Sequence, residues 1–349
     1  MSRSQPQLFR DQARACARLG SPMYADLLDR LAEDLEAGGP TRNVLRGHED
    51  DPGPSGLALR LAGSIHRLVL AGLAPELSAY YPTVGGTWSP DGGAAVVDLL
   101  DRRGDEVRPW LDRAPQTNEV GRAAALIGGL LLVATRWPLP VRLFEIGASG
   151  GLNLRADRFR CTDDAGGRWG DRRSPVLLDH AWEGAPLPLG TRLQVVERGG
   201  CDISPIDVTT DEGRLTLTAY VWPDMSARQA RLAGAIALAR QEPARVQQAD
   251  AASYVEGLEL AAGHLTVVWH SVMWQYMPAD QQERVTARLA ELGSRASEEA
   301  PLVHLFAEPT RRTPEDRHRF WVVVETWPGQ GERRFVAQMA PHGLPVTWQ

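Results

Sequence analysis

The stretch 141–154, VRLFEIGASGGLNL, constrains the fold more than any other part of the chain. Its first residues are a short apolar run of strand formers closed by turn residues, which is typical of a buried central strand in a parallel sheet. Gly147, Gly150 and Gly151 would let the backbone turn sharply and come close to a ligand. We expect a helix to begin near Leu152, with its first amides free to bind a polar group. The stretch therefore predicts an α/β fold.

The glycine turn has more than one chemical interpretation. From Glu145 to Gly151 the pattern E-x-G-x-S-x-G resembles the first motif of class I S-adenosylmethionine-dependent methyltransferases, with Ser149 in place of the middle glycine. From Gly147 to Gly151 it also matches the G-x-S-x-G nucleophile elbow of α/β-hydrolases, with Ser149 as the nucleophile. A dinucleotide site would need G-x-G-x-x-G, and Ser149 replaces its second glycine. A tight turn that binds nothing is the remaining interpretation.

Composition and charge exclude several other classes. The net charge of −6 argues against a general nucleic-acid-binding surface. No window is apolar enough for a transmembrane helix, and the first residues, MSRSQPQLFRDQAR, lack the apolar core of a signal peptide. We therefore expect a cytoplasmic protein with neither nucleic acid nor a membrane as its partner.

The positions of the cysteines and the absence of lysine exclude several kinds of catalytic and metal site. The three cysteines, Cys16, Cys161 and Cys201, are widely spaced, which fits reduced thiols and offers no paired zinc motif, so we expect no metal. All 38 basic residues are arginine, which excludes a P-loop lysine or a Schiff-base lysine.

Residues 1–138 read as a helical N-terminal domain or lid. Apolar residues at three- and four-residue spacing predict amphipathic helices. The expected helices are 22–36, 57–73, 94–103, 106–112 and 123–135. His66 lies among apolar neighbours, and we interpret it as a packed structural histidine.

Residues 139–349 alternate between strand and helix patterns, which predicts a mostly parallel α/β sheet. The expected strands after the first are 193–202, 215–221, 246–249, 265–271 and 302–306, followed by an antiparallel pair at 320–326 and 334–339. The expected helices are 226–240, 251–260 and 279–292. The segment 155–190, rich in Gly, Pro, Asp and Arg, reads as an insertion with a short hairpin near 175–179.

Three later motifs lie where successive strands are expected to end. Asp202 in GCDISP resembles the ribose-binding acid of class I methyltransferases, and Asp250 in QQADA resembles the family acid near the adenine. WHSVMWQYM, residues 269–277, resembles the fourth motif, beside the reacting methyl group. In a doubly wound sheet such groups meet at the carboxyl ends of the strands. The hydrolase alternative lacks the upstream strands of that fold, although Asp250 with His304 or His342 could supply its acid and histidine.

The whole chain resembles one bacterial family. The motifs QTNEVGR, LFEIGASGGLNL, GCDISPID, YVWPD and VVWHSVMWQY are similar to those of a largely actinobacterial family described only as a domain of unknown function. The similarity runs over nearly all residues from Leu8 onward. It implies a Rossmann-like, class I methyltransferase-type sheet with an antiparallel C-terminal hairpin, behind an all-helical N-terminal region. It implies no particular substrate.

The methyltransferase motifs and the positions of polar residues at the expected strand ends suggest a role for each candidate residue. The cofactor-binding candidates are Glu145, Gly147, Ala148, Ser149, Gly151, Asp202, Asp250 and His270. For Asp250 the alternative is the N-cap of the next helix. His270 and Tyr276 are the candidate catalytic residues, since a histidine at a strand end can take a proton near neutral pH. The alternative for His270 is a buried histidine bonded to the backbone.

The substrate-binding candidates are Gln116, Asn118, Glu119, Arg122 and Trp274. The four that precede the helix 123–135 are explained equally well as helix caps. The predicted function is methyl transfer from S-adenosylmethionine to a small-molecule acceptor, with no oligomeric state implied. The alternatives are another use of the sulfonium that releases methylthioadenosine, a non-catalytic cofactor-binding protein, and the hydrolase.

Overall fold

The computed structural model describes residues 4–113 and 115–349. Residues 1–3 and 114 lie outside the described residues. Residues 1–3 begin the segment that was predicted not to be a signal peptide. The chain divides into two compact units, one formed by 1–117 with 210–229 and the other by 118–209 with 230–349. The helix Ala123–Arg136, which the sequence analysis placed in the N-terminal part, belongs to the second unit.

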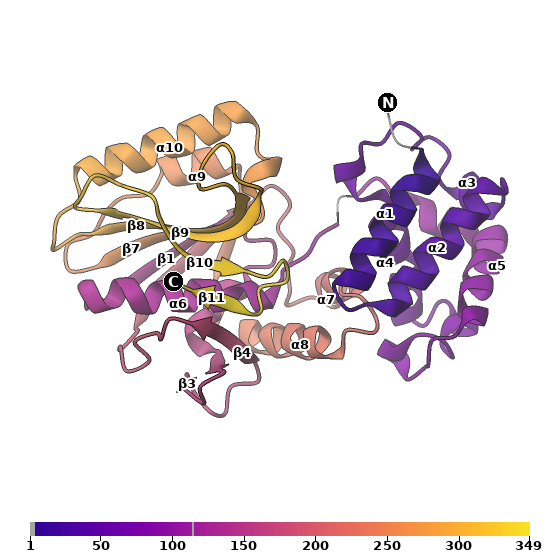
Figure 1. The fold of residues 1–349 in the computed structure, drawn as a ribbon, viewed down its shortest axis with the longest axis horizontal. Coiled ribbons are helices and arrows are strands. Elements are labelled where there is room, and N and C mark those ends of the chain that lie inside the picture. The colour runs from indigo at the N-terminus through magenta and orange to yellow at the C-terminus, as the bar shows by residue number, and fades with distance from the viewer. Residues whose placement is uncertain (1–3, 114) are drawn as a thin grey trace. The chain divides into compact units, whose positions relative to one another are not determined.

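The first unit is helical, as predicted, and Figure 1 shows its helices. Apolar stripes on these helices meet in one core that includes Leu27, Leu31, Leu61, Ile65 and Leu99. Its helices are α1 (Gln5–Arg18), α2 (Pro22–Glu36), α3 (Pro40–Val44), α4 (Leu57–Leu70), α5 (Pro90–Val107) and α7 (Asp211–Ala219). Short 3₁₀ turns connect them: η1 (Gly53–Ser55), η2 (Pro75–Leu77), η3 (Pro82–Val84) and η4 (Arg108–Trp110). A non-helical residue, Arg103, interrupts α5, close to the predicted break between two helices.

The YVWPD motif anchors this unit. Trp222 is buried in the helical core 6.1 Å from the ring of Tyr24, and Asp224 accepts hydrogen bonds from Ser21 Oγ (2.5 Å) and from the Met23 amide (3.0 Å) at the start of α2. Just before it, the predicted strand 215–221 is wrong, because Asp211–Ala219 is helix α7. Thr210 caps this helix by accepting the Gly213 amide, a local signal that outweighs the alternating LTLT pattern.

His66 is the packed structural histidine that was expected. Its Nδ1 lies 3.0 Å from the Ala219 carbonyl oxygen and its Nε2 lies 2.9 Å from Thr83 Oγ1. Burial lowers its pKa to about 4, so the ring stays neutral at physiological pH.

The second unit is built on a mixed sheet of eleven strands within the described residues, in the order β3-β2-β4-β11-β10-β9-β8-β7-β1-β5-β6. The strands are β1 (Val141–Ile146), β2 (Arg160–Asp163), β3 (Arg168–Trp169), β4 (Leu177–Gly184), β5 (Val195–Asp202), β6 (Arg245–Gln248), β7 (Leu265–Ser271), β8 (Leu302–Thr310), β9 (Arg319–Trp327), β10 (Arg334–Met339) and β11 (Val346–Trp348). The block β6-β5-β1-β7-β8 is parallel, and β9 and β10 form the predicted antiparallel pair. The predicted α/β class and closing hairpin are confirmed.

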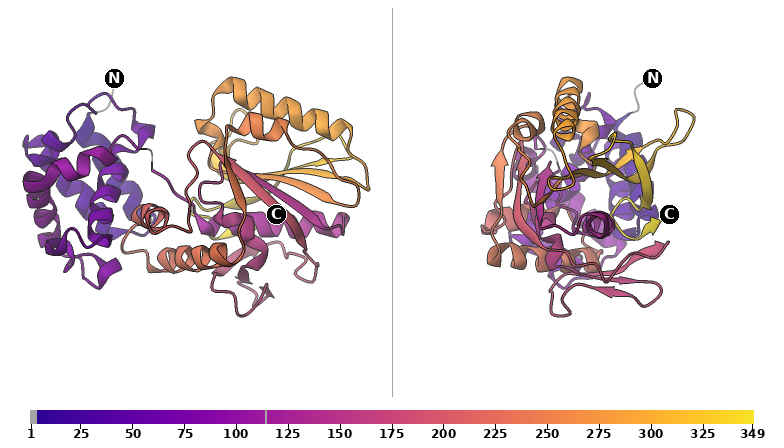
Figure 2. Two further views of the ribbon diagram at one scale, coloured as in Figure 1. Left: turned by 180° about the vertical axis from the view of Figure 1, so that it is seen from behind. Right: turned by 90° about the vertical axis from the view of Figure 1, so that its left-hand side faces the viewer.

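Helices cover both faces of this sheet. Figures 1 and 2 show α9 (Ala251–Glu256) and α10 (Ala279–Ser294) against one face, with α6 (Ala123–Arg136) against the other. The remaining helix is α8 (Ser226–Gln241), and the boundary between the two units falls within it, between Gln229 and Ala230. Helix α6 is apolar all round because it is buried, and at Gly128 and Gly129 a side chain would collide with Trp348 and Leu305.

Two local predictions in this unit are wrong. The helix expected from Leu152 is a 3₁₀ helix, η6 (Leu152–Arg158), with non-helical geometry at Arg155. The hairpin expected near 175–179 lies earlier, between β2 and β3, and β4 pairs in parallel with β2. The segment 155–190 thus adds strands to the sheet edge, because its polar and glycine-rich turns separate short strand runs that composition alone did not separate. Among the described helices, none is both long and apolar enough to cross a membrane.

Candidate functional site

The carboxyl ends of the parallel strands gather most of the predicted site residues. Numbered along the chain, the block β6-β5-β1-β7-β8 has the order 3-2-1-4-5, and in such sheets ligands bind where the order reverses. Here the reversal lies between β1 and β7. Gly147 follows β1 and Met273 follows β7, and the position of a Cβ on Gly147 would be 2.8 Å from Met273 Cγ. The two turns are therefore in direct contact.

The turn after β1 is tied to the end of β5. Asp202 Oδ2 accepts a hydrogen bond from the Ser149 amide at 2.8 Å, and Asp202 Oδ1 accepts one from the Ser204 amide at 2.9 Å. Ser149 is 5% exposed and has φ = 52°, a left-handed conformation that non-glycine residues rarely adopt. The structure thus brings Ser149 and Asp202, two of the predicted cofactor-binding residues, into contact.

The amides of this turn are largely used within the protein. The Ala148 amide donates to the Cys201 carbonyl oxygen at 2.9 Å, and the Leu152 amide donates to Asn118 Oδ1 at 2.8 Å. The expectation that the amides after the turn would be free is therefore wrong for Leu152. Because η6 is a short 3₁₀ helix whose first amide is occupied, it does not offer a phosphate site of the dinucleotide type.

Positions 147 and 151 require glycine because of their backbone conformation and their contacts within the protein. Their φ angles are 67° and 65°, and a Cβ on Gly151 would come within 2.6 Å of Val246 Cγ2. The contacts of Gly147 with Met273 and of Gly151 with Val246 fix the turn between β6 and β7. These glycines shape the turn, whatever it binds.

Glu145 is a buried acid on the α6 side of β1, 3% exposed. Burial raises the pKa of Glu145 to about 8, while the Trp269 indole and the Asn153 amide limit the rise. Its Oε2 has no hydrogen-bond partner among the described residues, and neither does Asn153 Oδ1. At neutral pH this carboxyl group is therefore largely protonated and carries a hydrogen atom to donate.

His270 lies at the end of β7 and is 1% exposed. Its Nδ1 is 2.8 Å from Glu308 Oε1, and its Nε2 is 3.1 Å from His304 Nε2. Its ring stacks between those of Trp274 and Phe306, with centroid distances of 5.1 and 5.2 Å. Both nitrogens are engaged by side chains, so the alternative of a histidine bonded to the backbone is wrong. The same contacts leave neither nitrogen open to a substrate.

The turn after β7 holds two further candidates, Trp274 and Tyr276, which differ in how far they are buried. Trp274 is half-buried against His270, whereas Tyr276 is 66% exposed and far less constrained. Between them and the strand, Val272 has φ = 52°, a strained value for a β-branched residue. The Val272 amide bonds to the Ala307 carbonyl oxygen at 3.1 Å, which holds the turn against β8.

Asp250 is the N-cap of α9. Its Oδ1 accepts the Ser253 amide at 2.8 Å and its Oδ2 accepts the Ser253 hydroxyl at 2.7 Å. This is the alternative that the sequence allowed. The carboxylate follows β6, next to the end of β5, where the Ala249 amide bonds to the Asp202 carbonyl oxygen at 3.1 Å.

The predicted substrate-binding residues in QTNEVGR fall in two different units of the structure. Gln116 belongs to the helical unit, whereas Asn118, Glu119 and Arg122 belong to the sheet unit. Asn118 binds the Leu152 amide, so it supports the glycine turn. Glu119 caps η5 (Val120–Arg122) through the Gly121 amide and lies 3.4 Å from His342 Nδ1, and Arg122 Nη1 lies 3.5 Å from the Ser271 carbonyl oxygen. Asn118 thus supports the turn after β1, and Arg122 contacts the end of β7.

The acid–histidine pairs of the hydrolase interpretation are not assembled. Asp250 directs both oxygens to Ser253, while His304 bonds to Glu325 through Nδ1 and to His270 through Nε2. His342 pairs with Glu119. Among the described residues, no cluster of three or more His, Cys, Asp or Glu side chains has the arrangement of a metal site.

Four residues of this region were missed as site candidates. Met273 joins the two turns, Ile203 is a 75%-exposed apolar side chain next to Asp202, and Glu308 and Glu325 bind the histidines. Ile203 and Met273 were visible within quoted motifs. Glu308 and Glu325 follow ordinary strand patterns, so only the pairing of β8 with β7 and β9 reveals them.

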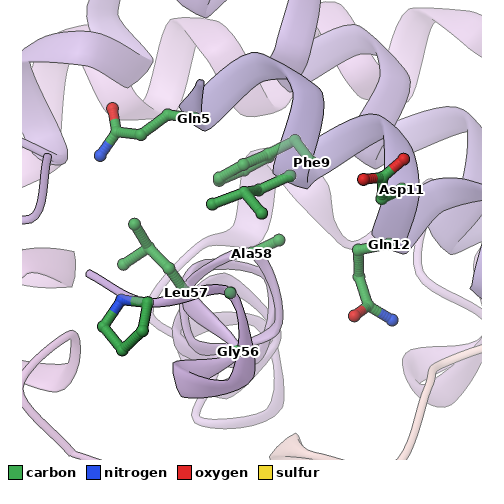
Figure 3. A pocket seen from close by; sticks show the side chains of 10 residues that line it. Gln5, Phe9, Asp11, Gln12, Gly56, Leu57 and Ala58 are labelled. Carbon is green, nitrogen blue, oxygen red and sulfur yellow. The ribbon is translucent and has the colours of Figure 1, made fainter. Parts of the chain in front are cut away.

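A cavity of about 290 Å³ lies elsewhere, within the helical unit. Figure 3 shows Phe9 and Leu57 on its wall, with Gln5, Asp11 and Gln12 around it. All of its lining residues belong to that unit, and none is a predicted site residue. It lacks the convergent titratable groups found at the strand ends.

The comparisons with known proteins identify a family and no activity. A protein-family model described as an uncharacterized protein conserved in bacteria (DUF2332) matches residues 6–348. A search of curated proteins finds no match.

Proposed function

The chain belongs to this bacterial family, and we propose that it is an S-adenosylmethionine-dependent methyltransferase that acts on a small-molecule acceptor. One observation carries the proposal: the acid that ends the second strand of a 3-2-1-4-5 block, Asp202, is hydrogen-bonded to the glycine turn that follows the first. A carboxylate and a turn so joined fit a nucleoside whose ribose carries two hydroxyls.

The chemistry of the side chains fits the cofactor. Asp202 accepts one protein N–H at each oxygen, which leaves further lone pairs for the ribose hydroxyls. The exposed Ile203 beside it offers apolar surface for the flat adenine ring. Asp250, at the next strand end, retains lone pairs for the adenine amine. Gly147, Ala148, Ser149 and Gly151 would border the methionine part, with the buried Glu145 beneath the turn.

When bound, adenosylmethionine supplies a methyl group activated by a positively charged sulfur. The protein's share is to position the acceptor, to keep water away and to accept a proton where the acceptor loses one. Trp274, held against His270, presents an aromatic surface that suits a cation. Glu145 Oε2 and Glu308 Oε2, which have no hydrogen-bond partner among the described residues, are two buried polar atoms near these turns that a ligand would complete.

Calorimetry with adenosylhomocysteine tests the proposal. We expect the wild-type protein to bind it and Asp202→Asn to bind at least about tenfold more weakly, because an amide removes one acceptor of the diol. Asp207→Asn, the same change five residues later on an exposed carboxylate bonded to Thr209, is the matched control and should stay within about twofold. Absence of binding of both adenosylmethionine and adenosylhomocysteine to the wild type would refute the proposal.

The released nucleoside distinguishes the related alternatives. Incubation of the protein with adenosylmethionine and a small-molecule cell extract should yield adenosylhomocysteine. Methylthioadenosine would instead indicate attack at another carbon of the sulfonium. Binding with neither product would indicate a non-catalytic cofactor-binding protein.

The hydrolase remains a second candidate because of one specific observation. Ser149 has a positive φ of 52° directly after a strand, as the serine of a nucleophile elbow does. Labelling of Ser149 by a fluorophosphonate probe, lost in Ser149→Gly, would favour it over the methyltransferase.

A further inference from the structure

Four buried titratable side chains on three neighbouring strands and one exposed arginine form a continuous chain of contacts. Glu308 on β8 contacts His270 on β7, His270 contacts His304 on β8, and His304 Nδ1 contacts Glu325 Oε2 on β9 at 2.7 Å. Arg333, just before β10, closes the chain by donating to Glu325 Oε1 at 2.8 Å. The side-chain exposures of Glu308, His270, His304 and Glu325 are 5%, 1%, 5% and 12%, so only the Arg333 end, at 58%, reaches solvent.

The contacts determine how many protons the chain holds. Its three links, Glu308–His270, His270–His304 and His304–Glu325, each need one bridging proton. Two neutral imidazoles bring only two protons, and if both were used toward the carboxylates, two lone pairs would face each other across 3.1 Å. We therefore assign a third proton to the chain, so that each link, including the one between the two imidazoles, holds one proton.

The resulting charge is balanced. Two carboxylates and one imidazolium give a net charge of −1, which Arg333 neutralises, as burial of charged groups requires. The rings of Trp274 and Phe306 on the two sides of His270 also favour a cation there. Burial lowers the pKa of His304 and opposes this proton, and the charges of His270 and Arg333 act in the same direction, whereas the hydrogen bond to Glu325 favours the proton. The charged groups that face the histidine pair are Glu308 from β8, Glu325 from β9 and Arg333.

Glu308 is the end of the chain that lies at the proposed site. Its Oε1 lies 2.8 Å from His270 Nδ1 and accepts hydrogen bonds from the Met273 amide at 3.0 Å and from the Trp274 amide at 3.3 Å. Its Oε2 is buried and has no hydrogen-bond partner among the described residues. Val272, with its positive φ of 52°, immediately precedes these two amides, and the Met273 side chain lies against Gly147, so this carboxylate adjoins the glycine turn.

We propose that Glu308 is the carboxylate that binds the acceptor molecule through Oε2, and that His270 and His304 are positioning residues whose shared proton holds it ionised. The inference rests on the proposed methyl transfer and names the acceptor class: a small molecule with an N–H or O–H at the atom to be methylated. The acceptor's nitrogen or oxygen gains the methyl group and loses its proton, and Glu308 Oε2 takes that proton to become a carboxylic acid. No oxidant or reductant is needed. His270, with both nitrogens engaged, does not touch the substrate.

Nuclear magnetic resonance of ¹⁵N-histidine-labelled resting protein tests the shared proton without any cofactor. We expect His270 and His304, assigned by His270→Gln and His304→Gln, to be protonated at both Nδ1 atoms and to share a strongly downfield proton at pH 7. Glu308→Gln should abolish that resonance, whereas Glu308→Asp, which keeps the charge, should retain it. Two neutral histidines in the wild type, or histidine signals unchanged in Glu308→Gln, would overturn the inference.

Transfer of labelled methyl groups into a small-molecule cell extract tests the acceptor-binding role. Glu308→Gln should lower the transfer by about 100-fold while adenosylhomocysteine affinity stays within about twofold. Glu332→Gln, on an exposed glutamate, is the control and should transfer normally. Undiminished transfer by Glu308→Gln would overturn the role. If the wild type binds no adenosylhomocysteine, the proposed function and the acceptor role fail together, while the resonance experiment still decides the shared proton.

Discussion

At the scale of single residues, Ser149 shows how one position can support two chemistries. The side chain is buried and the backbone is left-handed, so its φ of 52° suits glycine better than serine. A methyltransferase turn needs only a small residue there, whereas a hydrolase needs the hydroxyl. The substitution that removes the hydroxyl also relieves the strain, which makes the two interpretations separable.

We therefore predict that Ser149→Gly stabilises the protein by up to about 1 kcal/mol, because a non-glycine residue in this conformation costs about 1–2 kcal/mol and the extra freedom of glycine in the unfolded chain offsets part of the gain. Adenosylhomocysteine affinity should stay within about threefold. Urea unfolding and calorimetry provide the two measurements. Ser149→Val, which keeps the strain and adds bulk, is the contrasting variant. Loss of ester hydrolysis in Ser149→Gly would speak for the hydrolase instead.

His270 illustrates a residue whose type and position were predicted but whose partners were not. Its place at the end of β7 follows from the buried run LTVVWHS. Its contacts with His304 and Glu308 depend on β8 lying next to β7. These two partners are 34 and 38 positions away from His270 in the sequence. Short motifs carry no information about such contacts, so the histidine was interpreted as a direct base when its nitrogens are already occupied.

At the scale of elements, capping decided several outcomes. Thr210 converts an alternating run into helix α7, Ser21 and Asp224 begin α2, and Asp250 begins α9. Such caps satisfy amides that a helix leaves free, and they act locally enough to be seen in sequence. The sheet's edge was harder, because strands β2 and β3 are only four and two residues long.

The cap at α9 allows a test that separates structure from binding. Asp250→Ser keeps a capping oxygen and should leave stability within about 0.5 kcal/mol, whereas Asp250→Ala should cost about 1 kcal/mol. If Asp250 also contacts the adenine amine, both variants should bind adenosylhomocysteine more weakly by about three- to tenfold. Thermal unfolding and calorimetry on the two variants give the result. Unchanged affinity in Asp250→Ser would restrict Asp250 to capping.

At the scale of the whole molecule, the two units respond to pH in opposite directions. Burial lowers the pKa of His66 from 6.5 to about 4. Between these two pH values the unfolded chain binds a proton at His66 that the folded helical unit does not bind. The stability of the helical unit therefore falls as pH drops from 6.5 toward 4. Burial raises the pKa of Glu145 from 4.5 to about 8, so the unfolded chain releases a proton that the folded sheet unit keeps, and stability falls as pH rises from 4.5 toward 8.

We predict that His66→Gln flattens the acidic loss and Glu145→Gln flattens the alkaline one. Each pKa unit corresponds to about 1.4 kcal/mol, so each slope should change by a few kcal/mol over its window. Hydrogen exchange measured by mass spectrometry at pH 5, 7 and 8.5 resolves peptides from the two units. Because both substitutions also alter hydrogen bonds, slopes rather than absolute stabilities are compared. Parallel slopes in the wild type and Glu145→Gln would contradict the buried neutral acid.

The sequence by itself determined the fold class, most of the helices, the central strands and the turn at Gly147, because hydrophobic period, glycine and caps act over a few residues. It also placed Asp202 and His270 at strand ends. Only the tertiary structure decided that Asp202 clamps Ser149, that Asn118 occupies the Leu152 amide, and that Glu308, His304 and Glu325 complete the chain around His270. Those contacts join segments that are distant in sequence. The order of strands in the sheet, set by packing of both faces, brings them together.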